Sequence, residues 1–115
     1  MTKNLNLNVR LAFLIGWTGV VEANGALVGT PPTGAPACRG QALVPDWAGD
    51  WRDCGPLIAR YGMTLGSSTS DAYATCRGFD VYGPGIEEFS HHVDADAAHR
   101  AAVVQSVINM LEFDR

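Results

Sequence analysis

The stretch VPDWAGDWRDCGPLIARYGMTL, covering Val44–Leu65, decides how this sequence is interpreted. Its second half places apolar residues at helical spacing and predicts a helix over Trp51–Tyr61 with one side facing a core. Gly49 or Asp50 is expected to cap the start of this helix, because such residues can satisfy or accommodate the exposed amides of the first turn. Gly62 is expected to end the helix, since glycine readily adopts the left-handed conformation found there.

The sequence predicts further elements on both sides of this helix. Asn24-Gly25 between two short apolar runs is a strong signal for a hairpin. A long final helix is predicted from an apolar stripe that begins at Ala97, with Ser106 on the opposite, polar side. The expected elements are a helix over Val9–Ile15 capped by Asn8, strands near Val20–Ala23 and Ala26–Gly29, a loop over Thr30–Gly40, strands over Met63–Leu65, Asp71–Cys76 and Glu87–Val93, and a helix from Asp94 to about Phe113.

This order of elements predicts one domain over residues 1–115, of the mixed α/β (α+β) class. Helix, hairpin, helix, two or three strands and helix follow one another along the chain. Short strands joined by tight turns favour antiparallel pairing, so we expect a small, mainly antiparallel sheet packed by helices.

Composition limits the classes of partner. The chain has 115 residues, 47% of them hydrophobic, and a formal net charge of −4. The acidic balance and scattered arginines give no attraction to nucleic acid or to anionic membranes. The apolar run Leu11–Ile15 is too short to span a bilayer, so an intracellular, cytoplasmic protein is expected. Cys38, Cys54 and Cys76 have no metal-binding spacing and are expected to be free thiols.

Three blocks of the sequence together resemble one family. They are LNVRLAFLIGW (Leu7–Trp17), DWRDCGPLIARYGMTL (Asp50–Leu65) and DADAAHRAAVVQSVINML (Asp94–Leu111), which contains Arg-Ala-Ala. In this order they are similar to the phage α-β-α sandwich domain, found in uncharacterised accessory proteins of phages and prophages. The resemblance implies a three-layer α-β-α sandwich. It supplies no catalytic residues, so none is assigned here.

One cluster carries side chains that could ligate a metal: HHVDADAAH, with His91, His92, Asp94 and His99. Adjacent histidines in a strand point to opposite faces, and Asp94 is expected to cap the last helix. Cys76 beside His91 or His92 would be the arrangement needed for a thiol nucleophile. We expect surface histidines and a buried thiol instead, with no metal, no cofactor and no catalytic residue.

Arg100 falls within the apolar arc of the last helix, where a guanidinium needs a partner. Asp96, one turn earlier, is one candidate partner, and Asp50 is the other. The sequence therefore predicts a structural ion pair between Arg100 and one of these carboxylates.

Trp47 and Asp46 are the predicted partner-binding residues. They lie outside the helix and beside the proline-rich loop, and an exposed tryptophan in such a place is typical of a contact site.

Together these features predict a non-enzymatic accessory protein of a phage or prophage. It is expected to bind another host or phage protein in the host cytoplasm, and an edge strand could also pair two copies into a homodimer. The alternative is a small metal- or thiol-dependent enzyme that uses His91, His92, Asp94 or Cys76. Convergence of those side chains in one pocket would favour it.

Overall fold

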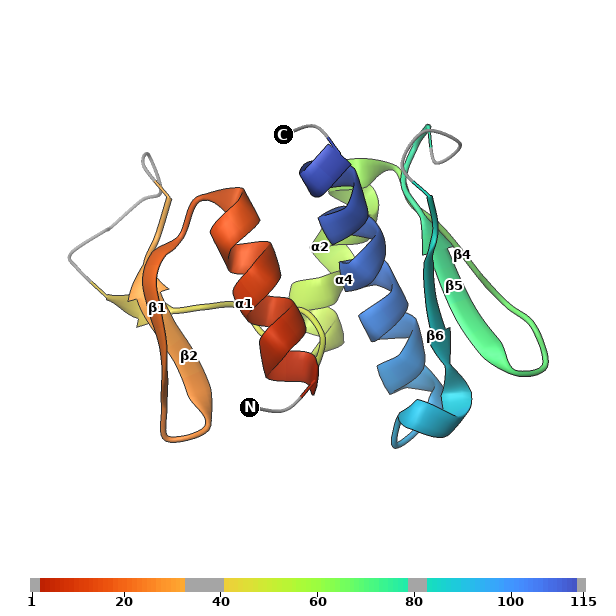
Figure 1. Ribbon diagram of the computed structural model, residues 1–115, viewed down its shortest axis with the longest axis horizontal. Helices are drawn as coiled ribbons and strands as arrows, with labels where there is room; N and C mark the ends of the chain where they lie inside the picture. Colours follow the sequence, from red (N-terminus) through yellow and green to blue (C-terminus); the bar gives the residue numbers. More distant parts are fainter. Residues whose placement is uncertain (1–2, 33–40, 79–82, 114–115) are drawn as a thin grey trace.

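The computed structural model describes residues 3–32, 41–78 and 83–113 of the chain (Figure 1). Cys38 and most of the predicted proline-rich loop lie outside these ranges. The described elements, in chain order, are α1 (Lys3–Ile15), β1 (Thr18–Ala23), β2 (Ala26–Thr30), β3 (Ala42–Leu43), α2 (Trp51–Tyr61), β4 (Thr64–Ser67), β5 (Asp71–Thr75), β6 (Gly85–Glu88), the 3₁₀-helix η1 (Phe89–His91) and α4 (Ala95–Phe113).

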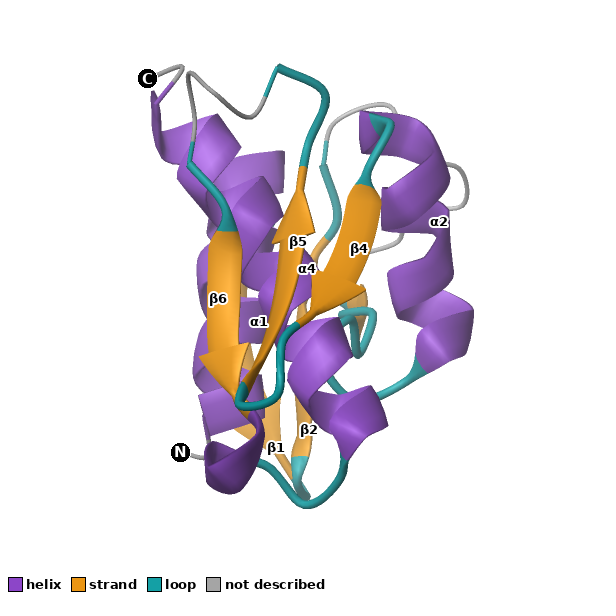
Figure 2. Cartoon of the chain, turned by 90° about the vertical axis from the view of Figure 1, so that its right-hand side faces the viewer, coloured by secondary structure: helices purple, strands orange, loops and turns teal. Residues whose placement is uncertain are grey.

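The strands form two separate sheets of three strands each. The first sheet has the order β1-β2-β3 and the second has the order β4-β5-β6, with antiparallel neighbours throughout. The helices lie between the two sheets in Figure 1, and the second sheet stands in front of α4 in Figure 2. The expected mixed α+β sandwich with antiparallel pairing is therefore confirmed. The strands are divided between two sheets, so the layers run from sheet through helices to sheet.

The hairpin of the first sheet is confirmed. Asn24 has a φ of 54° and Gly25 a φ of 81°, which is the left-handed conformation that a tight two-residue turn requires. Ala23 and Ala26 pair directly on either side of this turn.

Helix α1 begins earlier than the sequence predicts, at Lys3, so Asn8 is not its cap. Asn8 lies inside the helix and is buried. Its side-chain Nδ2 donates to Asp46 Oδ1 at 2.8 Å, and its Oδ1 accepts a hydrogen bond from the Ala48 main-chain N–H at 3.0 Å. The residue chosen as a cap from local sequence is instead the polar link between α1 and the segment that leads into α2.

Helix α2 has the bounds and both ends that the sequence predicts. The Asp50 side chain accepts a hydrogen bond from Arg52 N, which satisfies one of the free amides of the first turn. Gly62 ends the helix in the left-handed conformation, with a φ of 59°, and its N–H donates to Ile58 O.

Helix α4 is the central element of the core. Between Ala97 and Ile108 its buried residues point in all directions around the helix, and Ser106, predicted on a polar face, is buried too. A helix that is apolar all round needs cover on every side. The second sheet covers one side of α4, and α1 and α2 cover others. None of the helices in the described ranges has the length and apolar character needed to cross a membrane.

Small residues allow the second sheet to approach α4 closely. Ala72 and Ala74 of β5 face the helix and are completely buried. Gly85 of β6 lies directly against the helix backbone, because a Cβ placed there would come within 2.1 Å of the Ala102 carbonyl oxygen and 2.6 Å of Ser106 N. The close contact between β6 and α4 therefore depends on the missing side chain of one glycine.

The last predicted strand ends earlier than expected. Glu87–Val93 was predicted as extended, but the strand ends at Glu88 and η1 follows. Asp94 then caps α4, since its Oδ1 accepts a hydrogen bond from Ala97 N at 2.8 Å. His91 and His92 therefore lie at the end of a 3₁₀ turn. They are not in a strand, where neighbouring side chains would point to opposite faces.

Candidate functional site

Of the two predicted partner-binding residues, Trp47 is buried and Asp46 is exposed. Trp47 is only 6% exposed and belongs to the core. The Asp46 main-chain oxygen accepts hydrogen bonds from Gly49 N and Asp50 N, and this turn directs the indole inward. The Asp46 carboxylate accepts from Asn8 Nδ2. The prediction of an exposed contact tryptophan was wrong, because the turn that leads into α2 buries it.

Arg100 has a structural role, but its predicted carboxylate partners were wrong. Its Nε donates to the Ala48 main-chain oxygen at 3.2 Å, and its guanidinium lies over the Trp51 ring at 5.5 Å from the centroid. None of the ion pairs among the described residues involves Arg100. Asp50 caps α2 and pairs with Arg52, while Asp96 is exposed in the first turn of α4.

The histidines do not converge on one point. His91 is exposed, with its Nε2 3.4 Å from Glu88 Oε2, and His99 Nδ1 lies 2.8 Å from the Ala95 main-chain oxygen. No group of three or more His, Cys, Asp or Glu in the described part of the chain is arranged to hold a metal ion.

A buried carboxylate that the sequence did not reveal, that of Glu87, lies beside His92. Glu87 is 7% exposed and faces inward from β6. Its Oε1 lies 2.6 Å from Lys3 Nζ and 2.8 Å from His92 Nε2. A buried carboxylate needs such partners, so this group fastens the start of α1 to the second sheet.

The two described cysteines are poor nucleophiles. Burial raises the pKa of the Cys54 thiol to about 12, although the positive charge of Arg100 acts in the opposite direction. Burial also raises the pKa of Cys76, partly offset by the hydrogen bond between its Sγ and Ser106 Oγ at 3.4 Å. A thiol nucleophile reacts as the thiolate, so these shifts lower reactivity at neutral pH.

We therefore expect Cys54 and Cys76 to resist thiol reagents while the protein is folded. In a Cys38→Ser background, labelling at pH 7.5 should be at least about tenfold slower than that of free cysteine, and fast in denaturant, because burial both shields the thiols and disfavours the thiolate. Mass spectrometry after timed quenching measures this. Labelling of native Cys76 as fast as free cysteine would restore the thiol-enzyme alternative.

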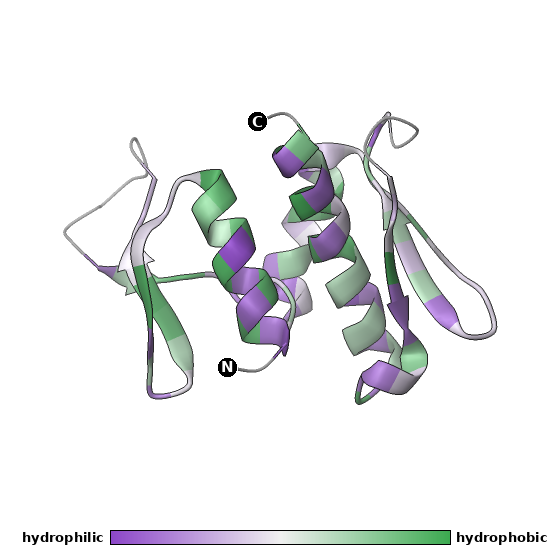
Figure 3. Cartoon of the chain, viewed as in Figure 1, coloured by the Kyte–Doolittle hydropathy of each residue, from purple (hydrophilic) through white to green (hydrophobic). Residues whose placement is uncertain are grey.

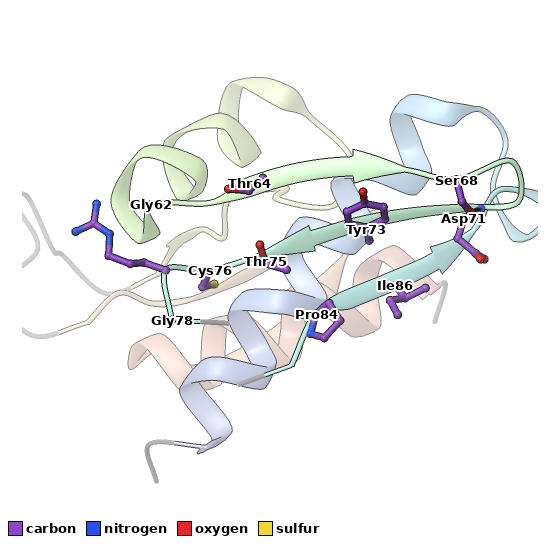
Figure 4. Close-up of a pocket in the computed structure, with 11 residues that line it drawn as sticks. Gly62, Thr64, Ser68, Asp71, Tyr73, Thr75, Cys76, Gly78, Pro84 and Ile86 are labelled. Atoms are coloured by element: carbon purple, nitrogen blue, oxygen red, sulfur yellow. Dashed lines mark hydrogen bonds between the residues drawn. The ribbon is translucent and has the colours of Figure 1, made fainter. Parts of the chain in front are cut away.

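A concave surface lies on the outer face of the second sheet, the side turned away from α4. We call it the binding face; it contains a hollow of about 620 Å³ (Figure 4). Strand register places its side chains in rows across β4, β5 and β6. The binding face comprises Thr64, Gly66, Ser68, Asp71, Tyr73, Thr75, Arg77, Pro84, Ile86 and Glu88.

Tyr73 is at the centre of the binding face. It pairs across the sheet with Gly66 on one side and Ile86 on the other. A Cβ at Gly66 would collide with the Tyr73 ring, so the ring lies over that glycine. Tyr73 is 41% exposed and Ile86 is 56% exposed. Two large, adjacent, accessible side chains on an uncovered sheet face are the usual components of a contact surface.

The two ends of the binding face carry charges of different sign. At one end the acidic residues Asp71 and Glu88 are cross-strand neighbours. At the other end the Arg77 guanidinium lies over Gly62, within 2.9 Å of where a Cβ would stand. Thr64 and Thr75 place hydroxyl groups between them (Figure 4). The face thus offers an apolar centre, hydroxyl groups and a charge at each end.

A second hollow, of about 530 Å³, lies between α1 and the end of α4. Arg10 Nη2 and the Glu112 carboxylate form an ion pair across it, with Nη2 2.9 Å from each of the two carboxylate oxygens. Its charged groups are therefore already satisfied within the chain, and the binding face is the better candidate.

The sequence contained a signal for the binding face. In DAYAT (Asp71–Thr75) polar or aromatic residues alternate with alanine, which is the pattern of a strand covered on one side only. The pattern does not reveal that the other side stays open. Comparison of the chain with family models, with curated proteins and with solved structures found no match.

Proposed function

We propose that this protein is a non-enzymatic binding module and that it contacts another protein through the binding face of its second sheet. The observation that supports this most directly is the exposed Tyr73–Ile86 pair over the hollow on an uncovered sheet face. At protein interfaces a few residues supply most of the binding energy, and tyrosine is among the residue types enriched in that role.

The enzyme alternative gains no support from the geometry of the described residues. His91, His92 and His99 have separate partners within the chain. Cys76 is buried and its hydrogen-bond partner is a serine, not a base. A thiol nucleophile requires a thiolate next to a base, and Cys76 lacks both conditions.

A phage or prophage origin, and action in the host cytoplasm, are also part of this proposal. Both rest on the three sequence blocks Leu7–Trp17, Asp50–Leu65 and Asp94–Leu111 and on the composition of the chain. A homodimer stays a prediction of the sequence, and the net charge of −4 on each copy works against it.

The proposal predicts that Tyr73→Thr loses the partner. Tagged wild-type protein is incubated with a lysate of its native cell, and captured proteins are identified by mass spectrometry. Threonine keeps the strand preference and removes the ring, so capture should fall at least about tenfold. Leu43→Ser is the matched control, because Leu43 is an exposed apolar residue of the first sheet.

Two outcomes would contradict the proposal. A partner that Tyr73→Thr retains and Leu43→Ser loses would move the contact surface to the first sheet, where apolar residues colour the β1–β2 hairpin green in Figure 3. Capture of no protein by the wild type would remove the binding function itself.

A further inference from the structure

Strand β6 forms one edge of the second sheet, and its hydrogen-bond pattern identifies the groups that face outward. Phe89 N donates to Ser70 O at 2.9 Å across the β5–β6 pair. In an antiparallel pair, hydrogen-bonded positions alternate with positions that point the other way. Register then directs the main-chain groups of Ile86 and Glu88 away from β5, toward the open edge.

Within residues 3–32, 41–78 and 83–113, some of these outward groups have no hydrogen-bond partner. The Glu88 carbonyl is at the cap of η1, where it can accept the first bond of that turn. No hydrogen bond among the described residues uses the N–H or C=O of Ile86, or the N–H of Glu88. An edge strand with free donors and acceptors is a template for another strand.

The side chains beside this edge indicate what kind of strand fits. Ile86 and Glu88 project from the same face, next to Tyr73 and Asp71 respectively. An antiparallel strand laid along β6 would place one residue opposite Ile86 and, two positions earlier, another opposite Glu88. The first position suits an apolar residue. The second suits lysine or arginine, because Asp71 and Glu88 are both acidic.

A second copy of this chain fits the edge less well. Two copies joined through β6 would bring together acidic strands, each containing Glu87 and Glu88, from molecules that each carry a net charge of −4. Like charges on paired strands are destabilising. Charge therefore favours a basic segment of another protein.

We propose that the partner supplies an extended segment that pairs with β6 as an additional antiparallel strand, with a basic residue opposite Glu88 and an apolar residue opposite Ile86. This inference rests on the proposed function and names the class of partner. Main-chain hydrogen bonds would hold the segment, and the side chains opposite Ile86 and Glu88 would select it, as in other cases of strand addition.

Synthetic peptides test the side-chain part of the proposal. The probe is a threonine-rich peptide with arginine two residues before valine, and its twin carries glutamate instead of arginine. Titration calorimetry or fluorescence anisotropy with the full chain gives Kd. The arginine peptide should bind wild-type protein at least about tenfold more tightly than its twin, because only it complements Asp71 and Glu88.

Two changes test the main-chain part. Methylation of the valine nitrogen removes the donor to Ile86 O and should weaken binding by about five- to tenfold. In the protein, Glu88 has a φ of −72°, which proline adopts without strain, so Glu88→Pro removes the outward N–H while leaving the backbone in place. Glu88→Gln is the matched control, because it removes the charge and keeps the N–H. The proline variant should bind about fivefold more weakly than the glutamine variant.

Thermal melts first establish that both variants are folded. Strand addition is overturned if N-methylation has no effect and the proline and glutamine variants bind equally, or if no probe peptide binds wild-type protein at millimolar concentration. If peptide binding is unaffected by N-methylation and by Glu88→Pro but is lost in Tyr73→Thr, the peptide contacts the binding face and does not pair with β6. The lysate capture described above decides the proposed function independently.

Discussion

Replacing Gly85 with alanine is expected to destabilise the protein by about 2–4 kcal/mol. The added methyl group would meet the main-chain oxygen of Ala102 and the nitrogen of Ser106, at 2.1 Å and 2.6 Å. These are atoms of a rigid helix backbone, so no side-chain rotation relieves the clash. Either β6 or α4 must move, and both are held by the completely buried alanines and valines around α4. Chemical denaturation of wild type and variant, monitored by circular dichroism, measures the change in the free energy of unfolding.

Gly55→Ala is the matched control for this prediction. Gly55 lies inside α2, and a Cβ there would have nothing within 4 Å. The same substitution should therefore stabilise the protein by up to about 1 kcal/mol, because alanine is the better helix former. Equal denaturation midpoints for Gly85→Ala and wild type would show that the sheet and α4 are not in such close contact.

Local signals in the sequence predicted local structure correctly. The hairpin turn predicted at Asn24-Gly25 is present. The helix predicted over Trp51–Tyr61 is also present, with Asp50 and Gly62 at its ends. Such features depend on the conformational preferences of a few neighbouring residues. The fold class followed from the order of these elements.

Features that depend on distant residues were not predicted. Asn8 has the side chain of a cap, but its partners Asp46 and Ala48 lie about forty positions away and make it an interior residue of α1. Ser106 sits on what looked like a polar face, yet Cys76 and the second sheet cover it. The division of the strands into two sheets depends on strand pairing, which helical and strand periodicity do not encode.

The candidate site was missed for the same reason. Trp47 is large, aromatic and next to a loop, which are the features of a contact residue in a sequence, whereas Tyr73 lies inside a short strand. The structure reverses their exposure: Trp47 is 6% exposed and Tyr73 is 41% exposed. Alternation in a strand reveals that its two sides differ, but only the tertiary arrangement decides which side another layer covers.

Trp47→Ala is expected to destabilise the protein by about 3–5 kcal/mol, the range typical of a large aromatic residue removed from a core. Trp47 packs in the central cluster at the turn where Asn8 ties α1 to the start of α2. Its removal would leave a cavity where these helices meet, and relaxation of the backbone would strain the hydrogen bonds that Asn8 makes. Domains of this kind have free energies of unfolding of about 5–15 kcal/mol, so much of the variant could be unfolded at 37 °C.

The comparison with Tyr73→Thr separates a core tryptophan from a contact tryptophan. Urea denaturation monitored by circular dichroism should show a much lower free energy of unfolding for Trp47→Ala. For Tyr73→Thr, whose ring is on the surface, the free energy of unfolding should change by less than about 1 kcal/mol. Trp47→Phe should lie between, because it restores part of the buried volume. If Trp47→Ala instead kept the wild-type midpoint and lost the captured partner, Trp47 would be the contact residue and the turn at Asp46 would have to open to expose it. Loss of the partner by the folded Tyr73→Thr variant is the opposite result, and it is the one that the exposure of these two side chains leads us to expect.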